Sequence, residues 1–66
     1  MPYTLTIENQ EPQEGLTFKE ATEKAEEYCW FNYAQYDCVE ARTSEGIYCE
    51  YIAKGEQKTI ATIDYK

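Results

Sequence analysis

The chain has 66 residues and a formal net charge of −7 at pH 7, because acidic side chains outnumber basic ones by 13 to 6. A chain of this length forms one domain, residues 1–66, and buries only about 60% of its unfolded surface, so its aromatic side chains or dimerisation must supplement a small core. The acidic balance disfavours direct binding to nucleic acid or an anionic membrane, and it suits a basic partner. The chain has no apolar run near the ~20 residues of a membrane span, and its first residues do not have the pattern of a signal peptide. These features predict a cytoplasmic protein.

Residues 3–8 alternate between apolar and polar side chains, which predicts a half-buried β-strand. Its inward residues are Tyr3, Leu5 and Ile7. The stretch that follows, residues 9–15, is polar and contains a proline and a glycine, so a solvated loop is expected there. The same reasoning predicts that the carboxylates Glu8, Glu11 and Glu14 are solvated.

Residues 17–33 have the pattern of a helix. Thr17 and Glu20 have the spacing of a capping box, in which each side chain satisfies the other residue's backbone N–H. At about 100° per residue, one stripe of the helix should face a sheet. This stripe contains Phe18, Ala21, Thr22, Ala25, Cys29 and Asn32, with Tyr28 at its edge.

The opposite side of the helix combines acidic residues with aromatic ones, namely Glu20, Glu23, Glu27 and Trp30, with Phe31 beside them. Two interpretations of Trp30 are open. The favoured one ends or tightens the helix near Tyr28 and turns Trp30 into the core, because a lone tryptophan in so small a protein is more often packed. In the other, Trp30 is the exposed anchor of an acidic interface.

Three further stretches, residues 38–43, 47–53 and 58–65, read as strands joined by short glycine-containing turns, which is typical of successive hairpins. The expected inward residues are Val39 and Ala41, then Ile47, Cys49 and Tyr51, then Ala61, Ile63 and Tyr65. The element order β-α-β-β-β predicts an α+β fold, a two-layer sandwich with one helix packed on a mainly antiparallel four-stranded sheet.

One helix cannot cover all the apolar residues of four strands. The alternation predicts that Tyr48, Ile52 and Ile60 lie on the open face of the sheet, beside Thr4, Thr6, Glu40 and Arg42. Such a cluster suits a partner or a homodimer, but scattered surface hydrophobics are also ordinary on a sheet. The sequence leaves these two interpretations open.

The chain contains no histidine, which removes Ser-His-Asp and Cys-His nucleophilic sites and His-containing metal sites. It also has no glycine-rich phosphate loop and no calcium-binding loop. Cys29, Cys38 and Cys49 are odd in number and do not have metal-ligand spacing, so they are expected to be free thiols, with one disulfide or a reactive thiol as the alternative. We therefore expect no catalytic, cofactor or metal site.

The stretch Leu16-Thr-Phe-Lys-Glu-Ala-Thr-Glu-Lys-Ala25 is a capped helix that follows one strand and precedes a three-strand meander. In element order and size, the chain resembles small inhibitor proteins of phages and mobile elements, most of all anti-CRISPR proteins of about this length. The resemblance implies an inhibitor that acts in the cytoplasm of the host. One family with this layout is basic and this chain is acidic, so neither its mechanism nor any functional residue is carried over.

The leading expectation is a small acidic, non-enzymatic protein that blocks a basic surface of a target, such as a nucleic-acid-binding surface. The expected contacts are Glu20, Glu23, Glu27, Trp30 and Phe31. A helix of some 15 residues is about 22 Å long, and duplex DNA of that length carries about 13 charges, so four helix glutamates suit a local plug rather than a full duplex mimic. The alternative is a structural or accessory homodimer without an inhibitory role, and a small enzyme is the third candidate.

Overall fold

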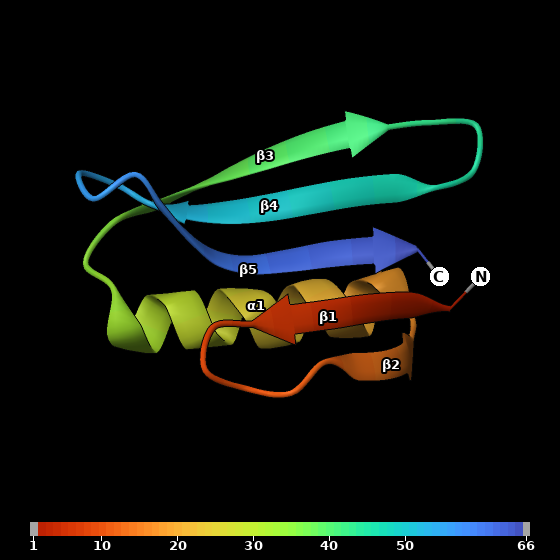
Figure 1. Ribbon diagram of the computed structural model, residues 1–66, viewed down its shortest axis with the longest axis horizontal. Coiled ribbons are helices and arrows are strands. Elements are labelled where there is room, and N and C mark those ends of the chain that lie inside the picture. The colour runs from red at the N-terminus through yellow and green to blue at the C-terminus, as the bar shows by residue number, and fades with distance from the viewer. Residues whose placement is uncertain (1, 66) are drawn as a thin grey trace.

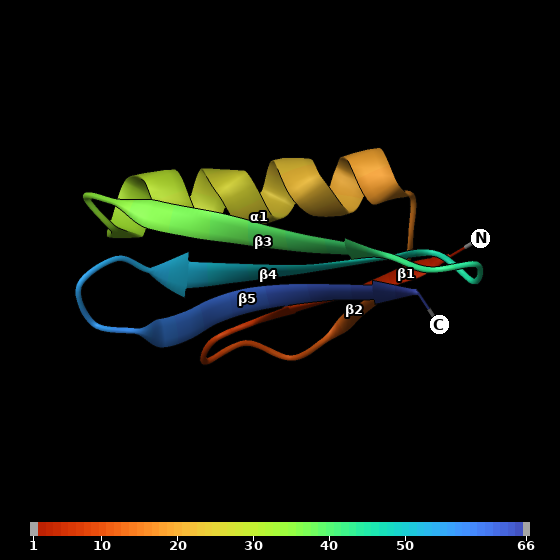
Figure 2. The same ribbon diagram turned by 90° about the horizontal axis from the view of Figure 1, so that it is seen from above.

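The structure is a computed structural model that describes residues 2–65. One helix, α1 (Phe18–Asn32), lies on one face of a five-stranded antiparallel sheet, as Figures 1 and 2 show. The strands are β1 (Tyr3–Ile7), β2 (Gln13–Leu16), β3 (Tyr36–Arg42), β4 (Ile47–Ala53) and β5 (Lys58–Tyr65). Their order across the sheet is β2-β1-β5-β4-β3. The predicted α+β class is confirmed, and the element order is β-β-α-β-β-β rather than β-α-β-β-β.

The additional strand is β2, within a stretch that was predicted to be loop. It pairs antiparallel with β1, with Leu16 opposite Tyr3 and Gln13 opposite Leu5, and the register shifts between these pairs. Gly15 has a φ of +74°, a backbone conformation that glycine adopts without strain. The loop prediction was wrong because pairing with β1, and not local propensity, makes this stretch a strand.

Helix α1 begins where the capping box predicted. The Thr17 backbone N–H donates to Glu20 Oε1 over 2.9 Å, and the Glu20 N–H donates to Thr17 Oγ1 over 3.1 Å. At the other end the Tyr33 N–H donates to the Cys29 carbonyl over 2.9 Å, while Tyr33 itself is extended. The predicted helix is therefore confirmed in full length.

The inner stripe of α1 is made of small side chains. Ala21, Ala25 and Cys29 are fully buried, which lets the helix backbone approach the sheet closely. Asn32 was also assigned to this stripe, and that assignment was wrong: the residue is exposed. Its side chain instead donates to the Tyr28 carbonyl over 2.8 Å and covers the end of the helix.

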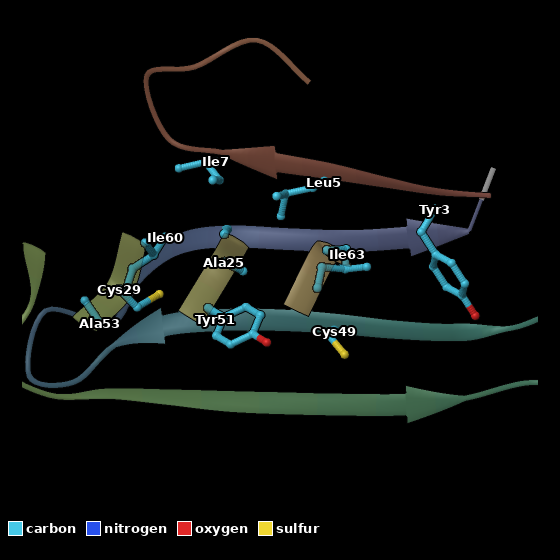
Figure 3. Close-up of a cluster of buried hydrophobic side chains, with 12 residues drawn as sticks. Tyr3, Leu5, Ile7, Ala25, Cys29, Cys49, Tyr51, Ala53, Ile60 and Ile63 are labelled. Atoms are coloured by element: carbon cyan, nitrogen blue, oxygen red, sulfur yellow. The ribbon is translucent and has the colours of Figure 1, made fainter. Parts of the chain in front are cut away.

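The core lies between α1 and the central strands β1, β5 and β4, and β3 contributes none of the side chains drawn in Figure 3. The predicted inward residues of β1 are confirmed as buried, and so are Cys49 and Tyr51 of β4 and Ala61 and Ile63 of β5. Ile47 and Tyr65, which were also predicted to face inward, are half-buried and pack against this core.

Ile60 was predicted on the open face, and the structure buries it to 1% exposure. The cause is a shift in the β4–β5 register: Tyr51 lies opposite Ala61, but Ile52 lies opposite Thr59. Ile60 is thus the extra residue of a β-bulge, which breaks the alternation that the prediction assumed.

Strand β3 begins at Tyr36, two residues earlier than predicted, and its facing was also mispredicted. Val39 lies opposite Glu50 and Ala41 opposite Tyr48, so both lie on the open face, and Val39 is 54% exposed. Glu40 and Arg42, predicted there, lie on the helix side of the sheet instead. The physical reason is that α1 packs on β1, β5 and β2 and leaves β3 uncovered. Because neither face of β3 is buried in the core, the inward-facing side chains of this strand need not be apolar.

Replacing the cap tests the local basis of this fold. Thr17→Ala should lower the free energy of unfolding by about 0.5–2 kcal/mol, because one N-terminal N–H loses its partner. Thr22→Ala is the matched control, since it removes a hydroxyl from the same helix without uncapping it. Chemical denaturation measures both, and equal losses in the two variants would contradict the role of the cap.

Candidate functional site

The side of α1 opposite the buried stripe combines charge and aromatic surface. Its residues are Glu20, Glu23, Glu27, Trp30 and Phe31, which we call the outer helix face; all of them are exposed. Trp30 is 71% and Phe31 72% exposed, and their rings meet edge to face with centroids 5.2 Å apart. The interpretation that placed Trp30 in the core is therefore wrong.

Trp30 points outward because the helix continues past it to Asn32 and because contacts on either side of the Trp30–Phe31 pair fix the rotation of the helix. Cys29 is fully buried, and Tyr28 and Tyr33 both reach the carboxylate of Glu8 at the end of β1. Since successive helical residues point about 100° apart, burial of Cys29 directs Trp30 and Phe31 away from the sheet.

Glu8 is the centre of a polar cluster that joins β1, α1 and β5. Its Oε2 accepts hydrogen bonds from the Tyr28 hydroxyl at 3.0 Å and from the Tyr33 hydroxyl, and Lys58 Nζ lies 3.0 Å from its Oε1. The Glu8 side chain is only 14% exposed. We call Glu8, Tyr28, Tyr33 and Lys58 the Glu8 cluster. The prediction that Glu8 is solvated was wrong, because its partners come from distant parts of the chain.

Electrostatics keep this cluster in one protonation state at neutral pH. Hydrogen bonds from Tyr33 and Lys58 hold the pKa of the Glu8 carboxyl below its ordinary value of 4.5. The same contacts with Glu8 raise the pKa of Tyr33 and of Lys58. An ionised carboxylate therefore accepts hydrogen bonds from two neutral tyrosine hydroxyls and pairs with an ammonium group, which makes these charge-assisted interactions.

A shallow pocket of about 310 Å³ continues the outer helix face toward the chain between β1 and β2. Glu27, Tyr28 and Phe31 line it from the helix, and Gln10 and Gln13 line it from the other side. Lys24 also lines it, so the pocket combines an aromatic wall with a carboxylate, an ammonium group and amide groups.

The open face of the sheet is less apolar than predicted. Tyr48 and Ile52 lie there and are half-buried, but Ile60 does not. Thr59, Thr62 and Asp64 of β5 occupy the remaining surface together with threonines of β1. The predicted cluster of Tyr48, Ile52 and Ile60 is therefore not brought together.

The cysteines are free thiols in the structure. Cys29 and Cys49 are buried, and burial raises the pKa of each thiol to about 11, so both are protonated at neutral pH and act as small core side chains. Cys38 of β3 is exposed.

Within residues 2–65, no group of three or more His, Cys, Asp or Glu side chains is arranged to hold a metal ion. The single helix of that part of the chain is too short and too polar to cross a membrane. Searches with this chain against protein-family models, curated proteins and solved structures give no match.

The Glu8 cluster predicts an acid-dependent loss of stability. Because the pKa of Glu8 is lowered by folding, its contribution is present above pH 4.5 and is lost as pH falls through the folded-state pKa. Glu8→Gln should lower the midpoint of thermal unfolding at pH 7, and the difference from the wild type should shrink as the pH falls below 4.5.

Glu11→Gln serves as the control, because it removes an exposed carboxylate from the chain that follows β1. Thermal unfolding followed by circular dichroism over this pH range measures the effect. A Glu8→Gln variant that melts like the wild type at pH 7 would refute the structural role of the cluster.

Proposed function

We propose that this chain is a non-enzymatic binding protein whose outer helix face covers a basic surface of a partner protein. The observation that carries the proposal is the exposed Trp30–Phe31 pair next to the carboxylates of Glu20, Glu23 and Glu27. Large aromatic side chains are the commonest anchors of protein interfaces, and most of their area here is accessible to a partner.

The two kinds of residue have different tasks in such an interface. The glutamates attract a basic partner at long range and raise the association rate. Trp30 and Phe31 supply apolar area that is desolvated on docking, which lowers the dissociation rate. The pocket beside Phe31 would accept one side chain from the partner.

The net charge of −7 supports a basic partner, such as the nucleic-acid-binding groove of a protein. Blocking such a groove would make the chain an inhibitor, in keeping with its resemblance in size to anti-CRISPR proteins of phages and mobile elements; the resemblance in element order no longer counts, because β2 precedes the helix. The alternative, a homodimer through the open sheet face without an inhibitory role, has less support, because Ile60 is buried.

Partner capture from the source cell or its host, with mass spectrometry, identifies the target, and variants then test the face. Trp30→Ala should weaken binding by about 2 kcal/mol or more, mainly through faster dissociation. The unfolding free energy of Trp30→Ala should change by no more than about 0.5 kcal/mol, because the side chain is 71% exposed.

Glu23→Lys combined with Glu27→Lys should instead slow association, and added salt should weaken wild-type binding.

Glu56→Lys is the control for charge reversal, since Glu56 is exposed in the turn between β4 and β5 and is not part of the outer helix face. Surface plasmon resonance separates the two rate constants. Binding that survives both Trp30→Ala and the double charge reversal would show that the outer helix face is not the site.

A further inference from the structure

Strand β3 is an edge strand that no other part of residues 2–65 covers. Each of its side chains from Asp37 to Arg42 is exposed, and only Tyr36 is half-buried. The other edge, β2, has four residues, a glycine at positive φ and a shifted register, which make it a poor template for pairing. In Figure 1, β3 is a long strand with no neighbour on its outer side.

The hydrogen bonds at both ends of the β3–β4 pair show which backbone groups are free. Lys54 N–H donates to the Gln35 carbonyl over 3.2 Å, and Thr43 N–H donates to the Gly46 carbonyl over 2.9 Å. In an antiparallel ladder, hydrogen-bonded pairs alternate with non-hydrogen-bonded pairs. The odd-numbered residues of β3 therefore bond to β4. The N–H and C=O groups of the even-numbered residues point to the free edge; these residues are Tyr36, Cys38, Glu40 and Arg42.

We propose that this edge pairs with β3 of a second copy of the chain, across a two-fold axis through Val39, to form a continuous ten-stranded sheet. The inference is independent of the proposed function. It places the two copies of Val39, a 54% exposed side chain, against each other on the open face. On the helix side it places Arg42 of each copy opposite Tyr36 of the other, within reach of a cation–π contact.

This register is favoured because it opposes no like charges. Glu40 meets Cys38 of the second copy, and Asp37 meets Ala41. Moving the axis by one residue to Glu40 would place the two Glu40 carboxylates directly opposite each other, which is destabilising. Moving it by one residue to Cys38 would place Arg42 opposite Ala34 of the second copy, which lies outside β3.

A second copy fits this edge better than a basic segment does, because the edge is locally neutral. Arg42 pairs with Glu40 at 3.1 Å, and Lys54 pairs with Asp37 at 3.9 Å. Helix α1, whose four glutamates and two lysines give it a net charge of −2, packs on β1, β5 and β2 and not on β3. The β5 strands of the two copies would be about 24 Å apart at 4.8 Å per strand, well beyond the ~8 Å Debye length at physiological salt, so repulsion between the helices is largely screened.

The predicted geometry also allows a variant that blocks pairing without breaking the sheet. Cys38→Pro removes an N–H that points to the free edge, and proline is tolerated on edge strands. The wild type should shift from 7.7 kDa toward twice that mass as its concentration rises, in sedimentation or light scattering. Cys38→Pro should remain monomeric, whereas the control Cys38→Ser, which keeps the N–H, should associate like the wild type.

A second pair of variants guards against misfolding of the proline variant. Val39→Lys places like charges at the two-fold axis and should abolish association, and Thr6→Lys, an equal change on an exposed residue of β1, should not. A wild-type mass of 7.7 kDa at every concentration would overturn the proposal. So would a dimer that persists in both Cys38→Pro and Val39→Lys and is lost in Tyr48→Glu, because the open face would then be the interface.

The register has its own test in a Cys38→Ser background. Val39→Cys should form a disulfide-linked dimer on mild oxidation, because non-hydrogen-bonded antiparallel partners have Cα atoms about 4.5 Å apart, within the range a disulfide spans. Ala41→Cys, which faces Asp37 in this register, should not. Equal cross-linking of both variants would overturn the axis through Val39.

Discussion

The rotational position of α1 about its own axis is the constraint on which the rest of the structure depends. It is determined by Ala21, Ala25 and Cys29, which are small enough to let the helix lie directly on the sheet. The Glu8 cluster also fixes the rotation of the helix at its C-terminal end. Tyr28 and Tyr33 lie on either side of Trp30 and Phe31 in the sequence, and both donate hydrogen bonds to the Glu8 carboxylate. With these contacts made, the helix has no rotation that would bury Trp30 and keep Cys29 inside.

The same packing explains why the β3 edge of the sheet is left uncovered. A single helix with a narrow inner stripe covers β1, β5 and β2, and the core extends to β4 through Tyr51 and Cys49. Strand β3 lies beyond the reach of the helix, so neither of its faces is buried. The fold thus presents a charged aromatic surface on the helix and a neutral backbone edge at β3, and the two surfaces can act independently.

Local chemistry made part of this structure predictable. The capping box located the start of α1, and the alternation in β1 and β4 identified the buried residues, because these signals arise within a few residues of the chain. Apart from Asn32, whose side chain bonds to the carbonyl of Tyr28, the missed features depend on contacts between residues far apart in sequence. Strand β2 forms because its backbone pairs with β1. Ile60 is buried because a β-bulge shifts the register of β5 against β4. Glu8 is held by side chains that lie 20, 25 and 50 positions away in the sequence. The residues of the outer helix face could be named from the helical pattern, but the exposure of Trp30 depends on where the helix ends and what holds its last turn.

Trp30 is the only tryptophan of the chain, so tryptophan fluorescence reports directly on whether this side chain is exposed. Its exposure depends on the rotational position of α1, which also determines the outer helix face. The measurement is the emission spectrum and acrylamide quenching of the isolated protein, taken at a concentration where it is monomeric. Our account predicts an emission maximum close to that of free tryptophan in water, and quenching nearly as efficient as for a short tryptophan peptide. A blue-shifted emission that is protected from acrylamide in the monomer and becomes accessible only on unfolding would contradict it, because Trp30 would then lie in the core.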